Sequence, residues 1–242
     1  MSFKKLTKTY WSKRGTSYDK SPGHTEFEHI WESFILKTLQ ALRYKPSHAL
    51  DAGCGTGFLS KILKKYGIHT ICLDIAEGML IQAKRKLGEE FYIDFVQGDC
   101  EKVPLRDRAV DLVVSRHVLW ALERPHATFI SWLKVLRTGG LIISFDGRWY
   151  PRSAISKMKR IVLMLLSLPK QRVNIFLFLK YNILRLRWYD NVDIIELLLN
   201  RSKLYYKFVN LTRVRQLLQT FNRRLRLWRS QYYMIVVQKL HR

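Results

Sequence analysis

The chain has 242 residues, of which 48% are apolar, so it is long enough to bury one α/β core with an appended cap and needs no second domain. Its three cysteines form no CxxC motif and no histidine cluster accompanies them, which argues against disulfides and a zinc site and favours free thiols in a cytoplasmic protein without a metal. The net charge of +24 is uneven: residues 1–150 hold 23 Lys and Arg against 16 Asp and Glu, whereas residues 151–242 hold 20 against 3. A field of this sign attracts nucleic acid, an anionic membrane surface or an acidic small substrate, and the sign alone does not choose among them.

No targeting or membrane-spanning segment is expected. The N-terminus is basic but lacks a continuous apolar stretch and a small-residue cleavage site, so no signal peptide is predicted. The longest apolar run, at 161–169, is far shorter than the ~18–20 residues that span a bilayer.

A glycine-rich turn follows the first predicted strand. Residues 26–43 repeat apolar positions at helical spacing, and a strand over 48–51 then leads into Asp51-Ala-Gly-Cys-Gly-Thr-Gly57, ahead of a helix near 57–66. Glycines at 53, 55 and 57 allow a sharp turn and a close approach of a ligand to the main chain, and the helix N-terminus presents free N–H groups. The turn therefore predicts a nucleotide-like ligand.

The residues around this turn argue against a phosphate. Dinucleotide folds use G-x-G-x-x-G, whereas Phe58 stands here where the last glycine belongs, and no Gly-Lys-Ser/Thr of a P-loop follows. Asp51 would repel a phosphate and attract an ammonium group. The ligand expected has an adenosine-like body and a cationic head, a description that S-adenosylmethionine (SAM) fits.

Further strands are predicted near 70–74, 94–98, 111–115 and 141–146, alternating with helices near 77–87 and 126–137. This alternation predicts a parallel sheet with helices on both faces. Asp74 ends the second strand, close to the spacing from Asp51 at which an acid meets a ribose diol. After it, Ile75 and Met79 can pack on an adenine, Asp99 can accept from an exocyclic amine, and the Cys100 amide can donate to a ring nitrogen.

Together these motifs resemble the class I SAM-dependent methyltransferases, in particular the small-molecule branch with the ubiquinone/menaquinone and biotin-pathway methyltransferases. The resemblance covers roughly residues 10–148. It implies an α/β fold whose mostly parallel seven-stranded sheet has one antiparallel strand, SAM as cofactor and S-adenosylhomocysteine (SAH) as product. It places the methionine portion of SAM at Gly53, Gly55, Thr56 and Gly57, the ribose at Asp74, the adenine at Asp99 and Cys100, and the sulfonium beside Ser115 and Arg116.

The remaining segments complete a single expected domain. Residues 1–47 form an N-terminal arm and helix, 48–148 the cofactor-binding core, and 149–190 a helical cap that Pro169 breaks in two; residues 191–242 add a helix at 191–200, a strand at 204–211, a helix at 212–222 and a strand at 232–240. The cap is expected to cover the active site. Its basic residues are solvated, lie on anionic lipid at the inner membrane face, or bind RNA, and the three interpretations stay open.

Three side chains are candidates for contact with the reacting groups. Family members often begin with an aromatic segment that folds over the cofactor, so Tyr18 is a candidate contact of the methionine end and Trp11 a pocket wall, unless both only anchor the arm. His117 follows the fourth strand and is the best-placed general base, with loop support as its alternative role.

The expected activity is methyl transfer to a small-molecule or lipid-like acceptor. After the fourth strand no Asn/Asp-Pro-Pro-Tyr/Phe motif appears, and the chain has no Pro-Cys nucleophile, which disfavours methylation of DNA bases. RNA methylation, and a non-catalytic SAM-fold module that binds RNA or a protein partner, remain as alternatives. The sequence does not identify the acceptor atom or the oligomeric state.

Overall fold

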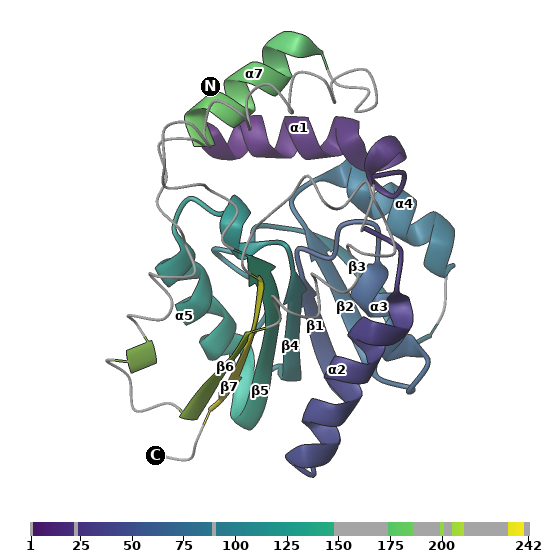
Figure 1. Ribbon diagram of the computed structural model, residues 1–242, viewed down its shortest axis with the longest axis vertical. Coiled ribbons are helices and arrows are strands. Elements are labelled where there is room, and N and C mark those ends of the chain that lie inside the picture. The colour runs from purple at the N-terminus through teal and green to yellow at the C-terminus, as the bar shows by residue number, and fades with distance from the viewer. Residues whose placement is uncertain are drawn as a thin grey trace.

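A seven-stranded sheet organises the computed structural model, which describes residues 2–21, 24–88, 91–147, 174–185, 199–200, 205–210 and 232–239 (Figure 1). Its strand order is β3-β2-β1-β4-β5-β7-β6. The strands are β1 His48–Ala52, β2 His69–Asp74, β3 Ile93–Gln97, β4 Val110–Arg116, β5 Leu136–Gly147, β6 Tyr205–Asn210 and β7 Tyr232–Gln238. The first five pair in parallel, and β7 runs antiparallel to both neighbours, β5 and β6. The predicted α/β fold is thereby confirmed.

Helices cover both faces of the sheet because successive strand residues point to opposite sides. On β4, Leu112 and Val114 face α2 and α3, whereas Val113 faces α5. These helices span Glu28–Ala41 (α2), Phe58–Lys64 (α3) and Pro125–Val135 (α5), and α4 spans Glu77–Leu87. Figure 1 shows α5 on one side of the sheet and α2 with α3 on the other.

Two helices lie above the carboxyl ends of the parallel strands. Helix α1 (Phe3–Tyr18) crosses this edge of the sheet, and α7 (Ile175–Arg185) packs on the outer side of α1 (Figure 1). Phe178 and Tyr181 of α7 are buried against Leu6 and Tyr10 of α1. Together α1 and α7 form a roof over the sheet edge.

Glycines let α1 approach α4 closely. A Cβ at Gly15 would lie 2.2 Å from the carbonyl oxygen of Gly78, and one at Gly78 would lie 2.1 Å from that of Ser12. The C-terminal half of α1 therefore packs backbone to backbone against the start of α4, a contact that larger residues would prevent.

The structure differs from the sequence predictions in two described places. Residues 3–18 form a helix where only an aromatic arm was expected. Residues 136–140, between the helix expected near 126–137 and the strand expected near 141–146, already belong to β5, which begins at Leu136 and carries extra residues opposite the step from Val110 to Leu112. Gly139 takes a left-handed φ of +80° there, and Gly139 and Gly140 exchange main-chain hydrogen bonds with Lys239.

Parts of the C-terminal predictions lie outside the described residues. Helix α7 is the described part of the expected cap, and the helix expected at 212–222 lies among the residues not described. Strands β6 and β7 confirm those expected near 204–211 and 232–240. No helix in the described ranges is long and apolar enough to cross a membrane.

Candidate active site

A cleft of about 750 Å³, including its open mouth, lies between the carboxyl ends of the strands and the underside of α1. Parallel sheets bind ligands at this edge, where neighbouring crossovers run to opposite faces; here that point lies between β1 and β4. The loops after β1 to β4 form its floor, and α1 forms its roof. The roof residues are Phe3, Lys4, Thr7, Trp11 and Tyr18.

The glycine turn after β1 keeps one position open to the cleft. Gly53, Gly55 and Gly57 all have a left-handed φ, between +56° and +82°. A Cβ at Gly53 would lie 2.5 Å from Cγ2 of Val118, and one at Gly57 would lie 2.7 Å from Cδ1 of Leu87. A Cβ at Gly55 meets only Cε1 of Tyr18, at 4.0 Å. Packing thus requires the outer two glycines, whereas Gly55 leaves its space to a ligand.

Asp51 holds the first turn of α3 against the end of β1. Its Oδ2 accepts hydrogen bonds from the Ser60 N–H at 3.0 Å and the Ser60 hydroxyl at 2.6 Å. The side chain is buried, and burial raises the pKa of the Asp51 carboxyl to about 6. Asp51 lines a smaller hollow of about 290 Å³ beside the cleft, where Thr56 and Arg116 also lie.

Asp74 joins the end of β2 to the glycine turn. Its Oδ2 accepts from the Gly55 N–H at 2.9 Å and its Oδ1 from the Ala76 N–H at 2.8 Å. Burial raises the pKa of this carboxyl to about 6 as well. Each oxygen retains a second lone pair, so the carboxylate, which lines the cleft, can still accept from a ligand hydroxyl.

A lysine from the roof reaches the far end of the cleft. The Lys4 ammonium lies 2.5 Å from Oδ2 of Asp99 and 2.7 Å from Oε2 of Glu101. Asp99 also accepts from the Glu101 N–H at 2.8 Å. Cys100 lines the cleft beside them, and burial raises the pKa of its thiol well above the ordinary value, so the thiol stays protonated. Ile75 and Met79 line the cleft too.

Of the two residues at the end of β4, only one faces the cleft. Arg116 lines both the cleft and the smaller hollow, and its guanidinium lies 3.6 Å from the centroid of the Phe58 ring. The Ser115 hydroxyl is fully buried and 2.7 Å from that of Ser144 on β5. Because successive side chains of a strand point to opposite faces of the sheet, the side chain of Ser115 lies on the face opposite to that of Arg116 and does not line the cleft.

Two other predicted residues face neighbouring groups of the protein. The Thr56 hydroxyl donates to Oδ1 of Asp19 at 2.6 Å and lines the smaller hollow. Gly57 precedes the first residue of α3 and lines neither space. Both therefore shape the turn around the cleft.

His117 sits on the cleft wall in a constrained backbone. Its φ of +61° is left-handed, an uncommon conformation for a residue with a side chain that often marks functional sites. The His117 N–H donates to the main-chain carbonyl of Phe145 at 2.8 Å, and the His117 carbonyl accepts from the Trp120 indole N–H at 2.6 Å. The ring centroid lies 6.1 Å from that of His24 and 6.4 Å from that of Trp31.

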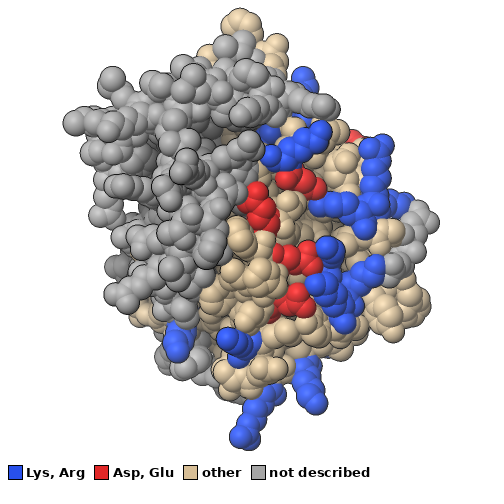
Figure 2. All heavy atoms as spheres, turned by 45° about the vertical axis from the view of Figure 1, so that its right-hand side comes forward, with Lys and Arg blue, Asp and Glu red and all other residues tan. Residues whose placement is uncertain are grey.

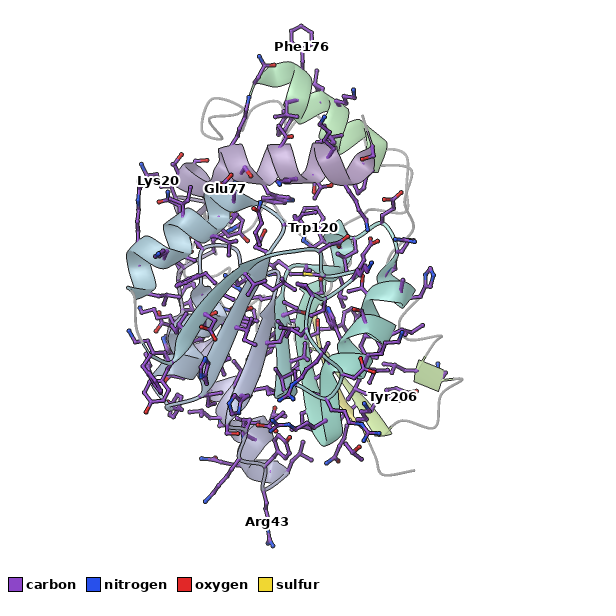
Figure 3. The ribbon with its side chains drawn as sticks, turned by 180° about the vertical axis from the view of Figure 1, so that it is seen from behind. Lys20, Arg43, Glu77, Trp120, Phe176 and Tyr206 are labelled. Carbon is purple, nitrogen blue, oxygen red and sulfur yellow. The ribbon has the colours of Figure 1, made fainter. Side chains whose placement is uncertain are left out.

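Aromatic side chains connect the roof to this wall. The Trp11 ring meets those of Tyr18 and Trp120 edge to face, at centroid distances of 5.8 and 6.1 Å, and its indole donates to the Tyr181 hydroxyl at 3.0 Å. Figure 3 shows Trp120 beneath α1. Sequence reasoning named Trp11 and Tyr18 but missed Lys4. The spacing of residues 4, 7, 11 and 18, which places them on one helix face, was the signal available.

Comparisons with known proteins agree with this geometry. Residues 50–144 match a family model described as a methyltransferase domain. A malonyl-acyl-carrier-protein O-methyltransferase of Serratia marcescens is 39% identical over 95 residues, covering 39% of this chain and 36% of that protein. A demethylmenaquinone methyltransferase of Clavibacter sepedonicus is 33% identical over 94 residues, covering 39% and 38%. The cofactor-binding core is a class I methyltransferase domain.

The match spans little more than a third of the length of these curated relatives. Two solved structures share the fold of the methyltransferase domain over more of the chain. The phosphoethanolamine N-methyltransferase 2 of Haemonchus contortus, solved with SAH, has a TM-score of 0.68 at 14% identity and covers all of this chain and 61% of that one. A SAM-dependent methyltransferase of Aquifex aeolicus has a TM-score of 0.53 at 16% identity and covers 85% and 89%.

SAM is the cofactor of this domain family, and the residues of the cleft fit it. The open space at Gly55 admits a ligand against the main chain, Asp74 and Asp99 offer carboxylate oxygens, and the buried Met79 offers an apolar contact. The described residues contain no group of three or more His, Cys, Asp or Glu that could hold a metal ion.

Proposed function

We propose that the protein transfers the methyl group of SAM to a small-molecule or lipid-like acceptor. One observation carries this proposal: the cleft under α1 brings the open position at Gly55 together with Asp74 and Asp99, each at or after the end of a successive strand. A non-catalytic binding module has no need to keep these cofactor carboxylates.

In this proposal the chain's residues bind the cofactor along the strand ends. Asp74 accepts from the ribose hydroxyls, and Asp99 with the Cys100 N–H meets the adenine, which packs on Ile75 and Met79. Gly53, Gly55, Thr56 and Gly57 shape the turn for the methionine portion, while Asp51 and Arg116 supply its charged contacts. The contacts of Ser115 within the sheet assign it a supporting role.

Bound SAM supplies an already activated methyl group, so the protein has mainly to position the acceptor. Holding two reactants in line contributes up to ~7–11 kcal/mol in the best cases. The rings of Trp11 and Tyr18 close the cleft from above and exclude water. His117 orients the acceptor from the opposite wall and takes up its proton where the acceptor atom carries one.

Methyl transfer is tested with purified protein, SAM and a panel of acceptors that pairs quinols with carboxylic acids of similar size. SAH should form only when an accepted compound is present, and Asp74→Ala should lower the rate at limiting SAM. Absence of binding by both SAM and SAH refutes the assignment. Binding of both without turnover on any acceptor class would favour the binding-module alternative.

We also propose that the protein associates peripherally with anionic membrane on the cytoplasmic side, through the basic cap at 149–190. On α7, Phe176 is 79% exposed and points away from the rest of the molecule (Figure 3). Lys180, about one helical turn further along, is also exposed. Most of the excess positive charge lies in the C-terminal third of the sequence. On the face over α2 and α3, by contrast, basic side chains lie beside acidic ones (Figure 2), as in the ion pairs of Glu28 with Lys61 and Lys65. Exposed aromatic and basic residues together favour the headgroup level of a bilayer.

Sedimentation with liposomes tests this association. More protein should sediment with anionic than with neutral vesicles, part of the binding should survive high salt, and Phe176→Ser should reduce the part that survives. Binding to RNA that is lost completely at high salt, without liposome binding, would favour an RNA partner. If the protein binds neither liposomes nor RNA, the membrane and RNA proposals are both refuted. The cap at 149–190 would then serve only to cover an active site for a soluble acceptor.

A further inference from the structure

A fully buried acid lies at the end of β5, and the proposed function does not use it. Asp146 is 0% exposed and lines neither the cleft nor the smaller hollow. Its Oδ2 accepts from the main-chain N–H of Trp120 at 3.2 Å, and its Oδ1 accepts from the N–H of Gly147 at 2.7 Å. A carboxylate holds main-chain N–H groups more strongly than a neutral acceptor does. Asp146 therefore fixes the loop after β4, which carries Trp120, and does not itself touch a ligand.

Trp120 connects this acid to His117 and to the roof. It lies beneath α1, in the single 3₁₀ turn Leu119–Ala121 (Figure 3). Its indole N–H donates to the His117 carbonyl at 2.6 Å, and its ring meets that of Trp11 edge to face at a centroid distance of 6.1 Å. His117 and Trp11 line the cleft, whereas Trp120 does not. Trp120 therefore acts on the cleft only through these two neighbours.

His117 depends on such contacts because its backbone is strained. A residue with a side chain keeps a left-handed φ, here +61°, only where its surroundings fix it. The His117 N–H donates to the main-chain carbonyl of Phe145, and the His117 carbonyl accepts from the Trp120 indole. The first bond continues the pairing of β4 with β5, whereas the second depends on the position of Trp120, which Asp146 holds. Without the second bond the His117 carbonyl can turn, and the residue can relax to an ordinary conformation.

We infer that Trp120 and Asp146 are positioning residues of the active site, which hold His117 in its left-handed conformation and so keep its imidazole at the cleft wall. The inference rests on the proposed methyltransferase function, in which His117 orients the acceptor and takes up its proton. Strained backbone of this kind gathers at active sites, where it fixes a side chain in one arrangement before the substrate binds. Because the same indole ring packs against Trp11, the wall and the roof of the cleft share one support.

A double-mutant cycle on stability tests this inference without any acceptor. His117→Gly removes the cost of the left-handed conformation but also the ring contacts of His117, so its effect on the midpoint of urea denaturation is compared between backgrounds. Trp120→Phe keeps an aromatic ring and removes the indole N–H, which lets His117 relax. His117→Gly should therefore raise the urea midpoint less, or lower it more, in Trp120→Phe than in the wild type.

Trp132→Phe is the matched control. Trp132 is a fully buried tryptophan of α5 whose indole N–H has no hydrogen-bond partner among the described residues, so this variant loses the same part of the ring without losing a hydrogen bond. In its background His117→Gly should shift the midpoint as it does in the wild type. The same shift in all three backgrounds, or an equal change in both phenylalanine variants, overturns the inference. If Trp120→Phe does not fold, Asp146→Asn replaces it, because an amide leaves one of the two main-chain N–H groups without an acceptor, and it should change the shift in the same direction.

Kinetics with an accepted compound give a second test. At saturating SAM, Trp120→Phe should lower kcat about tenfold or more and keep SAH affinity within about twofold, whereas Trp132→Phe should change neither. In the His117→Asn background, Trp120→Phe should lower kcat no further, because Trp120 acts through His117. An equal fall of kcat in both backgrounds, or parallel losses of kcat and SAH affinity, overturns the inference. If no compound is turned over, the proposed function fails instead, and the stability cycle alone decides whether Trp120 holds His117.

Discussion

The two glycines at 53 and 55 should respond differently to the same substitution. Gly55→Ala places a side chain at a φ of +56°, which costs about 1–2 kcal/mol of stability, and its Cβ meets no atom closer than 4.0 Å. Gly53→Ala carries the same conformational cost and adds a Cβ 2.5 Å from Val118, an overpacking worth about 1–3 kcal/mol more. Gly53→Ala should therefore lose about 2–5 kcal/mol in total.

Gly55→Ala should lose more affinity for SAH than its loss of stability explains. The added methyl of Gly55→Ala enters the open cleft where the cofactor is proposed to meet the main chain, so SAH affinity should fall about tenfold or more although the protein stays folded. Urea denaturation gives the stabilities and calorimetry the affinities. Val118→Ala in the Gly53→Ala background should recover the overpacking part only. Full SAH affinity in Gly55→Ala, or equal destabilisation by both glycine substitutions, would refute this reasoning.

Three further predictions address single side chains. Asp51→Asn keeps an oxygen that can accept from both Ser60 donors and removes a carboxyl whose pKa of about 6 in the folded state lies above its unfolded value of about 3.9. The stability of the wild type should therefore rise as the pH falls from 7 to 4, whereas the variant should be more stable than the wild type at pH 7.5, by up to about 3 kcal/mol, and show less of that rise. Urea denaturation measures both stabilities, and identical pH profiles would contradict the raised pKa of Asp51. His117→Asn, which tolerates the left-handed backbone, should lower kcat about 100-fold or more with SAH affinity nearly unchanged, and parallel losses would make His117 a structural residue. Lys4→Met removes the ion pairs that hold α1 to Asp99 and Glu101, so it should speed both association and dissociation of SAH in stopped-flow experiments. Lys5→Met, at the exposed neighbouring position, is the control and should change neither rate. Equal rates in the wild type and both variants would show that the ion pairs do not restrain the roof.

The floor of the cleft could be predicted from the sequence because its signals are local. Alternating glycines after an apolar strand, and acids at or just after the strand ends at 74 and 99, occupy short stretches whose spacing fixes their place at one edge of a parallel sheet. The side chain of Ser115 shows the limit of this reasoning. Which of two adjacent residues at a strand end faces the ligand depends on the pleat, and here Arg116 faces it.

The position of the roof over the sheet could not be predicted because tertiary contacts determine it. Helix α1 has a polar sequence with little amphipathic pattern, and its position depends on the close approach of Gly15 to Gly78 and on burial against α7. The pairing of Lys4 with Asp99 joins residues 95 positions apart. The step inside β5 at Gly139 likewise depends on main-chain bonds to Lys239, a partner that no local pattern indicates.

The central claim, that the cleft under α1 binds SAM, is tested most directly by calorimetric titration of SAM and SAH into wild-type protein and Asp74→Ala. We expect one site per chain with micromolar-range affinity for both ligands in the wild type. Loss of the ribose contact should weaken binding to Asp74→Ala by about 1–3 kcal/mol, with circular dichroism confirming that the variant is folded. No heat and no thermal stabilisation with either ligand, or unchanged affinity in folded Asp74→Ala, would contradict the account.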